Sequence, residues 1–311
     1  MTRKIKYPLI FLLLLSAGTA LLLKTGFFRK DELLRNPPAK RCAECHGKIF
    51  RDWEKSRHSL SWTSEGYAKE TENHKKIKCL GCHIPKEISF TEKPLPRDFH
   101  LDDGISCLAC HFRDGAMRGP HQVFSPPHPS ERDAVYRRSD ACKGCHVQTF
   151  KELKESGSPK TCQECHMPLR KEKMIDKFPY YLLPIHSEVD AGDHSMPALS
   201  LTDKDIRFEV RAGEGRLSAV LENTGVPHNL PTAENGDPRL YLEVEFFSRD
   251  SLLGREKTIF APQLETPLHF KKEWKEEYPL PKDCDRAKVS LMLRRSWKKE
   301  KELLAVREWK L

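Results

Sequence analysis

The sequence predicts a chain of two unlike domains: a mainly α-helical and irregular domain over residues 40–197, followed by an all-β sandwich over residues 201–311. Five Cys-x-x-Cys-His motifs all lie between residues 42 and 166. After residue 200 no such motif occurs, and apolar residues alternate with polar ones as in half-buried strands. Only 38% of the 311 residues are hydrophobic and 32% are charged, a low apolar content for this length. We therefore expect something other than side chains to fill the core of the first domain.

The N-terminus predicts export from the cytoplasm. Arg3, Lys4 and Lys6 precede an apolar run from Pro8 to Leu23, and secretion machinery recognises a basic region followed by a hydrophobic segment. The run would span about 24 Å as a helix, slightly less than a hydrocarbon core of about 30 Å. Residues 1–30 are thus predicted to be a signal peptide or an N-terminal membrane anchor. The protein would be anchored on the periplasmic side of the bacterial cytoplasmic membrane, or soluble in the periplasm if the signal is cleaved.

Ten of the eleven cysteines fall into five identical frames, each a Cys-x-x-Cys-His haem-attachment motif. Two thiols one helical turn apart can bond to the two vinyl groups of one porphyrin, and the histidine that follows can bind the iron. The cysteines predicted to attach haem are Cys42, Cys45, Cys79, Cys82, Cys107, Cys110, Cys142, Cys145, Cys162 and Cys165. The predicted proximal iron ligands are His46, His83, His111, His146 and His166. The predicted cofactor is therefore five covalently bound haem c groups.

Zinc binding and disulfide bonds are the two alternative explanations of these cysteines. Zinc ribbons pair their Cys-x-x-Cys units, and neither five units nor an export signal fits that pattern. Disulfides would explain an even number of cysteines but not the recurring histidine. The eleventh cysteine, Cys284, is expected to be an inert, partly buried thiol.

The formal net charge of +9 would ordinarily indicate nucleic acid or an anionic membrane as a partner. Five haems bring negative propionates that leave the loaded protein roughly neutral, so nucleic acid is not an expected partner. Because five macrocycles share residues 40–197, haems packed together would supply the missing apolar mass and the close contacts that conduction requires. The first domain is thus predicted to be a multihaem cytochrome c domain with a haem-filled core.

The distal iron ligands decide whether such a chain only conducts electrons or also catalyses a reaction. Nine histidines lie outside the motifs, and the favoured distal ligands are His58, His128, His194 and His228. His58 lies twelve residues after His46 on the same predicted helix. That distance is too long for the same iron and suits a neighbouring haem.

The other distal candidates follow the third motif. His128 lies in a proline-stiffened loop between the third and fourth motifs, and His121 is its competitor. His194 follows the last motif, and its neighbour Asp193 could orient the imidazole. The remaining histidines are expected to be surface, propionate-facing or structural residues: His74, His100, His186 and His269.

The first motif, followed by Phe50, Trp53 and Ser56-x-His58, resembles the opening of the multihaem family typified by the tetrahaem cytochrome c of ammonia-oxidising bacteria, related in haem packing to hydroxylamine oxidoreductase. Residues 104–111 and 161–168 also resemble that family, so the resemblance covers residues 40 to about 197. It implies that His58 is a distal ligand to another haem and that one haem is without a strong distal ligand. The fifth motif and the C-terminal extension depart from the pattern, so haem order and redox partner do not carry over. The Cys-x-x-Cys-Lys motif of pentahaem nitrite reductases is absent, which argues against that enzyme.

The last third of the chain predicts an immunoglobulin-like β-sandwich. Apolar residues alternate over 206–210, 217–221, 240–246 and 287–293, between turn-forming glycine, asparagine and proline residues. The loop of residues 223–232, NTGVPHNLPT, joins two of these strands. It resembles a loop of β domains appended to multihaem cytochromes, in which the histidine reaches a haem. By that resemblance His228 would bind iron and link the two domains, and the alternative is a loop or interface residue.

Three classes of function fit these observations. The first, which the sequence favours, is electron transfer in a respiratory chain between a redox protein donor, quinol-linked or soluble, and a redox protein acceptor. The second is an oxidoreductase acting on a small nitrogen or sulfur compound, such as nitrite, hydroxylamine or tetrathionate, at one open haem. The third is a haem-bearing subunit whose β domain docks a larger respiratory complex.

Overall fold

The computed structural model describes residues 6–24, 34–123, 125, 127–182, 186–202, 204–296 and 298–310. The chain divides into two compact units. The first unit is Met1–Cys145 with Cys162–Pro197, and the second unit is His146–Thr161 with Ala198–Leu311. Residues 146–161, which the sequence placed with the haem motifs, are thus grouped with the strands.

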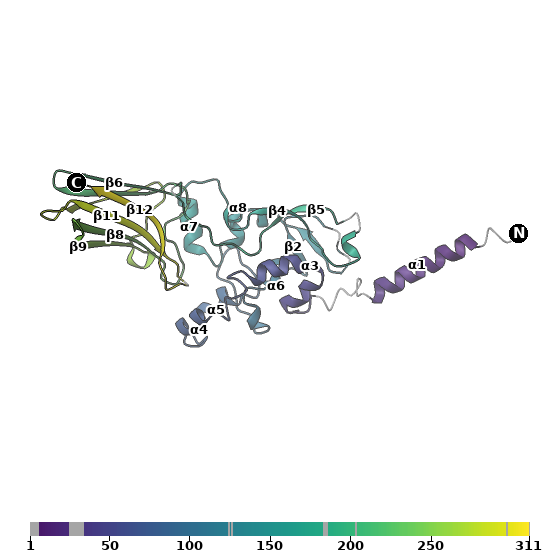
Figure 1. The fold of residues 1–311 in the computed structure, drawn as a ribbon. Coiled ribbons are helices and arrows are strands. Elements are labelled where there is room, and N and C mark those ends of the chain that lie inside the picture. The colour runs from purple at the N-terminus through teal and green to yellow at the C-terminus, as the bar shows by residue number, and fades with distance from the viewer. Residues whose placement is uncertain are drawn as a thin grey trace. The chain divides into compact units, whose positions relative to one another are not determined.

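A single apolar helix, α1 (Lys6–Lys24), opens the described chain (Figure 1). Its side chains from Ile10 to Leu15 are more than half exposed. Within the described ranges, none of the helices combines the length and the apolar character that crossing a lipid bilayer requires. Residues 1–5 and 25–30 of the predicted N-terminal segment lie outside the described residues.

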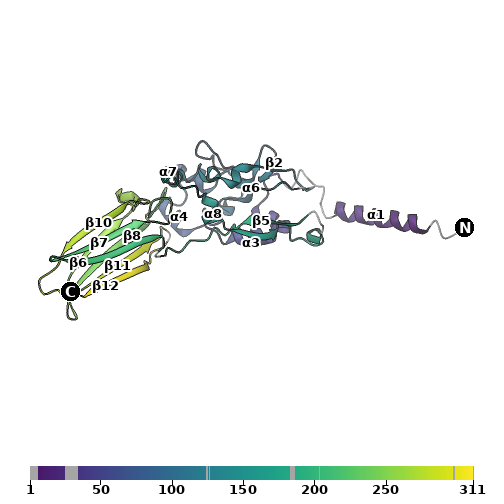
Figure 2. The same ribbon diagram turned by 90° about the horizontal axis from the view of Figure 1, so that it is seen from above.

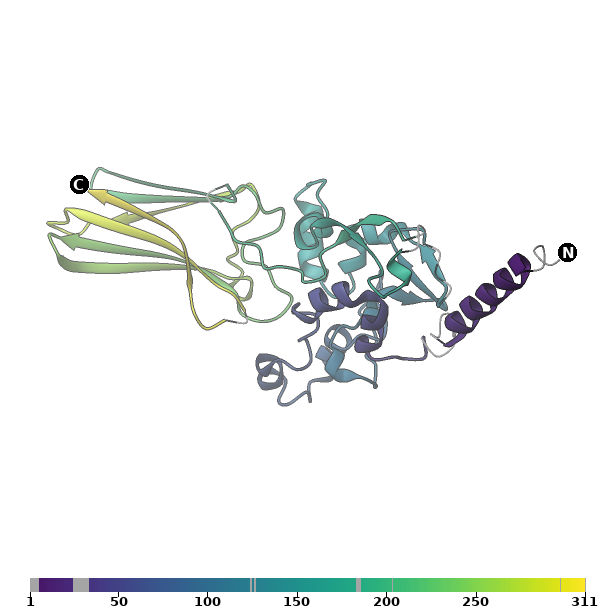
Figure 3. The ribbon, with the colours of Figure 1, turned by 45° about the vertical axis from the view of Figure 1, so that its right-hand side comes forward.

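The first unit consists of short helices joined by irregular loops (Figure 3). Its helices are α3 (Ala39–Glu54), α4 (Glu65–Glu70), α5 (Ile77–His83), α6 (Cys107–His111) and α8 (Cys162–His166). Its 3-10 turns are η1 (Leu101–Asp103), η2 (Ala134–Arg137), η3 (Ser139–Cys142) and η4 (Tyr180–Leu182). A small sheet is formed by β1 (Phe112–Arg113), β2 (Ala116–Gly119) and β3 (Ser130–Arg132), and an antiparallel pair by β4 (Leu169–Lys173) and β5 (Glu188–Gly192). Helices α6 and α8 are no longer than the five-residue motifs that they carry.

The helix that was predicted to carry His58 ends before it. Helix α3 is kinked at His46 and ends at Glu54, so His58 lies in the turns that follow. The Ser59 hydroxyl donates to the carbonyls of Glu54 at 2.9 Å and Ser56 at 2.8 Å. Serine side chains that bond to nearby backbone compete with helical hydrogen bonds, which explains the early end.

The second unit contains two antiparallel sheets, with the strand orders β10-β7-β6 and β12-β11-β8-β9 (Figure 2). The first sheet comprises β6 (Ile206–Gly213), β7 (Arg216–Asn223) and β10 (Glu273–Pro279). The second comprises β8 (Arg239–Ser248), β9 (Ser251–Phe260), β11 (Arg286–Arg294) and β12 (Glu302–Lys310). Helix α7 (Val147–Glu155) and the 3-10 turn η5 (Pro262–Leu264) complete the unit.

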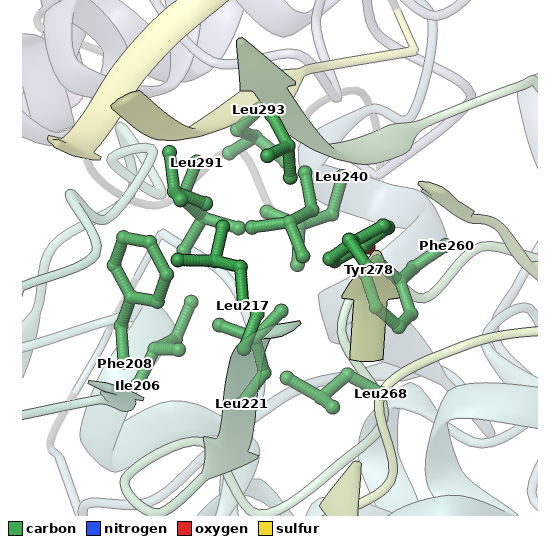
Figure 4. Close-up of a cluster of buried hydrophobic side chains, with 14 of the residues drawn as sticks. Ile206, Phe208, Leu217, Leu221, Leu240, Phe260, Leu268, Tyr278, Leu291 and Leu293 are labelled. Carbon is green, nitrogen blue, oxygen red and sulfur yellow. The ribbon is translucent and has the colours of Figure 1, made fainter. Parts of the chain in front are cut away.

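Both sheets contribute to one hydrophobic core (Figure 4). Leu217 and Leu221 of β7 meet Leu242 of β8 and Leu291 of β11, and all four side chains are buried. In β11 every second residue from position 287 to 293 is buried, which is the alternation that the sequence shows. The prediction of a β-rich C-terminal region is therefore confirmed. Among the described residues, this core cluster is drawn entirely from the second unit, so the first unit does not share it.

Truncating a core leucine should destabilise the second unit strongly. Leu291 is 1% exposed, so Leu291→Ala is expected to lower the free energy of unfolding by about 2–5 kcal/mol. The matched control is Leu303→Ala on the adjacent strand β12, where the side chain is 62% exposed and a change within about 0.5 kcal/mol is expected. Urea denaturation followed by tryptophan fluorescence measures both. Equal losses in the two variants would contradict the position of this core.

Candidate haem-binding site

Each of the five motifs places its histidine at the end or the break of a helix. Helices α5, α6 and α8 end at His83, His111 and His166. Helix α3 is kinked at His46 (φ −114°, ψ 41°), and His146 has nearly the same backbone angles (φ −103°, ψ 53°) just before α7. The two thiols of a helical motif lie one turn apart on one face, while the histidine is free to turn away from the helix axis. This arrangement suits attachment of a flat macrocycle at three points.

Three of the motif histidines donate a hydrogen bond from Nδ1 to a backbone carbonyl. The partner of His46 Nδ1 is the carbonyl of Met174 at 2.6 Å, and that of His83 is the carbonyl of Ser61 at 2.6 Å. His111 Nδ1 lies 2.7 Å from the carbonyl of Arg118. Since a carbonyl can only accept, Nδ1 carries the proton and Nε2 is left with its lone pair. Metal-binding histidines are oriented in this way by their second nitrogen.

Burial keeps these imidazoles neutral. Desolvation lowers the pKa of His46 and of His83, and it lowers the pKa of His111 to about 4, with the neighbouring His194 adding to the shift. Iron and other transition metals bind the neutral imidazole, so these groups need not lose a proton to bind one. The donor set and its protonation therefore fit a haem iron.

Two histidines outside the motifs lie opposite motif histidines. The ring centres of His46 and His128 are 6.3 Å apart, and those of His111 and His194 are 6.1 Å apart. If both Nε2 atoms bound one iron from opposite sides, bonds of about 2.0 Å and a nitrogen-to-centre distance of about 1.1 Å would place the centres about 6.2 Å apart. Both pairs are therefore spaced as two axial ligands of one iron are.

The histidines outside the motifs differ in which ring nitrogen forms a hydrogen bond. His128 Nδ1 contacts the Ser130 hydroxyl at 3.0 Å, His194 Nδ1 contacts the Gly192 carbonyl at 2.8 Å, and His228 Nδ1 contacts the Asn229 carbonyl at 2.9 Å. All three use Nδ1 for these contacts, as His46, His83 and His111 do. Asp193 Oδ1, expected to orient His194, accepts from the backbone N–H of Ser195 at 2.8 Å, and its effect on the His194 imidazole stays a prediction.

Two other histidines, His121 and His74, form hydrogen bonds through Nε2 instead. Their partners are the carbonyls of Asp190 at 2.9 Å and Trp62 at 3.0 Å. His269 Nδ1 contacts the Asn229 side chain at 3.0 Å. His100 is exposed and has a positive φ. His186 is half-buried, and its Nε2 is inaccessible to solvent. A nitrogen that is engaged with a carbonyl cannot at the same time bind iron, so His121 is a weaker candidate than His128.

His58 is anchored beside the helix of the third motif. Its carbonyl accepts from the backbone N–H of Ile105 at 2.9 Å, two residues before Cys107. Gly104 has a positive φ of 55°, and a Cβ there would lie 2.5 Å from the His58 carbonyl oxygen, so only glycine fits this approach. The structure thus places the backbone of His58 beside the residues that precede the helix of the third motif.

His228 lies in the second unit, in a loop that is organised by a buried asparagine. Asn223 is fully buried, and its Nδ2 donates to the carbonyls of Val226 at 2.9 Å and His228 at 2.7 Å. The same loop holds α7, because Glu152 of that helix accepts from the Thr232 hydroxyl at 2.7 Å. Helix α7 begins directly after His146, so the loop of His228 is tied to the helix that follows the fourth motif.

Thiols of different motifs also lie close together. Hydrogen bonds join Cys42 to Cys107, Cys82 to Cys145, and Cys142 to Cys162. The bond to Cys42, together with burial, holds the pKa of the Cys107 thiol well above its ordinary value. The Cys110 thiol interacts electrostatically with both Cys142 and Cys145. The first motif is therefore next to the third, the third next to the fourth, and the fourth next to both the second and the fifth.

Two tyrosines that the sequence did not single out pack on motif histidines. Tyr67 stacks on His83 with ring centres 3.8 Å apart, and Tyr136 stacks on His111 at 5.3 Å. The Tyr136 hydroxyl donates to the carbonyl of Cys110 at 2.5 Å. Burial raises the pKa of each tyrosine to about 12. No spacing or motif marks either residue, because both act through tertiary contacts.

The eleventh cysteine stands apart from this site. Cys284 is half-buried against the core of the second unit, and its thiol contacts the Arg286 carbonyl at 3.5 Å. In the part of the chain that the structure describes, no three His, Cys, Asp or Glu side chains are grouped so as to hold a bare metal ion.

The motifs, the fold and two similarities define the class of the chain. Residues 41–112 match the family model described as "Cytochrome c554 and c-prime". A penta-heme cytochrome c552 from Thermochromatium tepidum shares the fold with a TM-score of 0.63 and 19% identity, over 88% of this chain and 99% of that one. Together with the five motifs, these similarities support a multihaem c-type cytochrome that binds haem c.

Other comparisons add no argument. A DUF3823 family protein from Bacteroides ovatus ATCC 8483 overlaps 33% of this chain and 51% of its own, at 7% identity and a TM-score of 0.23, which is too low to indicate a shared fold. No curated protein matches the sequence.

Proposed function

We propose that this protein is a pentahaem electron carrier of a respiratory chain. Each of the five motifs would hold one haem c through its two thioether bonds and its histidine. The observation that carries the proposal is the spacing of the histidine pairs, 6.3 Å for His46 and His128 and 6.1 Å for His111 and His194. An iron with an imidazole on each side has no free coordination position for a substrate, and it cycles between ferric and ferrous states without changing ligands.

The remaining distal ligands that we propose are His58 and His228. His58 is supported by its anchorage next to the third motif, and His228 by its occupied Nδ1 and by the loop that holds α7. His228 would then bring a ligand from the second unit, which contains the strands. His121 is not proposed, since its Nε2 is bonded to Asp190.

The thiol contacts support a branched route for electrons. The first and third motifs would form one end, and the fourth would be the junction to the second and the fifth. Neighbouring motifs whose thiols touch would bring the edges of their macrocycles close together, which electron transfer by tunnelling requires. The route would link a redox protein donor, quinol-linked or soluble, to a redox protein acceptor.

The cellular setting is also part of the proposal. The basic residues before the apolar helix α1 support export to the periplasm, where haem c is attached in bacteria. The strand order supports an immunoglobulin-like sandwich in the second unit, with the first, second and fifth of seven strands in one sheet and the other four in the second. Docking of a larger respiratory complex by this region is an additional role that deletion of residues 201–311 would test.

Carbon monoxide binding and substrate turnover distinguish a carrier from an oxidoreductase. With four distal histidines proposed for five haems, carbon monoxide should change at most about one fifth of the haem absorption of the reduced protein, and nitrite or hydroxylamine should not speed its reoxidation. A small soluble ferric cytochrome c, used as a probe acceptor, should reoxidise it rapidly. A larger carbon monoxide response, or rapid oxidation by nitrite or hydroxylamine, would contradict the carrier and favour an oxidoreductase with an open haem.

A further inference from the structure

A short segment after the last motif holds the first motif in place. His46 Nδ1–H donates to the Met174 carbonyl at 2.6 Å across 128 residues of sequence. In return, the backbone N–H of Asp176 donates to the Cys45 carbonyl at 3.0 Å. His46 is therefore hydrogen-bonded to a segment that follows all five motifs in the sequence.

The carboxylate of Asp176 caps the part of α3 that follows the kink. Its Oδ1 accepts from the backbone N–H of Gly47 at 3.0 Å, and its Oδ2 from that of Lys48 at 2.9 Å. Because His46 is not helical, the second part of α3 starts at Gly47, and its first N–H groups have no partner within the helix. A carboxylate satisfies these groups and interacts favourably with the helix dipole.

The contact is close and is tied at a second point. Gly47 is buried, and a Cβ added there would lie 3.0 Å from Asp176 Oδ2 and 3.4 Å from Oδ1. Lys48 Nζ forms an ion pair at 2.7 Å with Glu172, whose side chain is 2% exposed. Residues 172–176 thus bind the kink of α3 through hydrogen bonds and an ion pair to residues 46–48, and we call them the latch.

We propose that Asp176 is a positioning residue for the first haem, fixing the plane of the His46 imidazole and lowering the reduction potential of that haem. The bond from Nδ1–H to Met174 makes the imidazole a stronger ligand, and a nearby negative charge favours ferric over ferrous iron. Arg51, whose Nη2 lies 3.8 Å from Asp176 Oδ2, offsets part of that charge. The inference rests on the proposed assignment of His46 and His128 as ligands of one iron.

Electron paramagnetic resonance of the full chain, combined with a redox titration, tests the latch. The variant His128→Met first identifies the signal of the first haem, as the one that it removes. Asp176→Asn should then shift the g values of this signal and raise its midpoint potential, with the other haems unchanged. Asp176→Glu should restore the potential, because it restores the charge. The matched control is Asp190→Asn, an exposed carboxylate paired with Lys171 at 2.9 Å, which should leave the signal unchanged.

A second variant separates geometry from charge. Gly47→Ala should displace the carboxylate and shift the g values, with a smaller change of potential than Asp176→Asn. If neither Asp176→Asn nor Gly47→Ala moves the signal that His128→Met removes, the latch is wrong while the ligand pair stands. If His128→Met removes no signal, the ligand pair is wrong, and the latch proposal fails with it.

Discussion

Replacing Cys107 and Cys110 together by alanine is expected to remove one covalently bound haem and to interrupt electron flow. The third motif adjoins the first through Cys42 and the fourth through the Cys110 thiol, so it lies between them in the proposed route. Without thioether bonds, a haem at this position is not retained after denaturation. Denaturing mass spectrometry should therefore find one fifth of the haem missing, and rapid reduction should become biphasic because the first haem is cut off.

Cys284→Ala is the matched control for the loss of the third motif. Its thiol lies in the second unit and contacts the Arg286 carbonyl, so the full haem content and a single reduction phase are expected. A double variant of Cys107 and Cys110 that keeps every haem would contradict attachment at the third motif. Loss of one haem with unchanged reduction kinetics would contradict the order of the route instead.

Replacing His194 by alanine is expected to open one iron. The imidazole of His194 lies opposite His111 with ring centres 6.1 Å apart, and its removal would leave the His111 iron with one protein ligand. That haem should change from low spin to high spin, which gives a new ferric resonance signal, and in the reduced state it should bind carbon monoxide. The fraction of the haem absorption that responds to carbon monoxide should increase by about one fifth relative to the unchanged protein.

His121→Ala is the control for this change, because His121 is also a histidine near the same segments but has its Nε2 on the Asp190 carbonyl. It should leave the spin states of the haems and their response to carbon monoxide as they are in the unchanged protein. If His121→Ala opens an iron and His194→Ala does not, the distal assignments made from the hydrogen-bonding nitrogens are wrong.

The central strands could be predicted from the sequence, and most of the edge strands could not. Strands β7, β8 and β11 each have two neighbours, and in β7, in β11 and in β8 from position 242 to 246 every second residue is buried. Strands β9, β10 and β12 lie at sheet edges, where charged residues replace part of the apolar face. Their pattern is therefore too weak to be distinguished from a polar loop.

The attachment motifs could be predicted because their residues are adjacent in the sequence, whereas the groups that orient the histidines come from other parts of the chain. Five residues in a fixed frame contain the thiols and the histidine of each site. The carbonyls that hold the imidazoles come from Met174, Ser61 and Arg118, and any residue can supply a carbonyl. The end of α3 before His58 was missed for a similar reason, since serine hydroxyls end the helix through their tertiary setting. Such contacts leave no signature in composition or spacing.

Near-infrared magnetic circular dichroism of the ferric protein, normalised to haem content, tests whether each of the two histidine pairs binds one iron. This spectrum distinguishes an iron with two imidazole ligands from one with an imidazole and another or no ligand. We expect a strong bis-imidazole band in the full protein, which weakens in equal steps in His128→Met and in His194→Ala. A protein whose band is unchanged in both variants would contradict the pairing of His46 with His128 and of His111 with His194, and with it the proposed electron carrier.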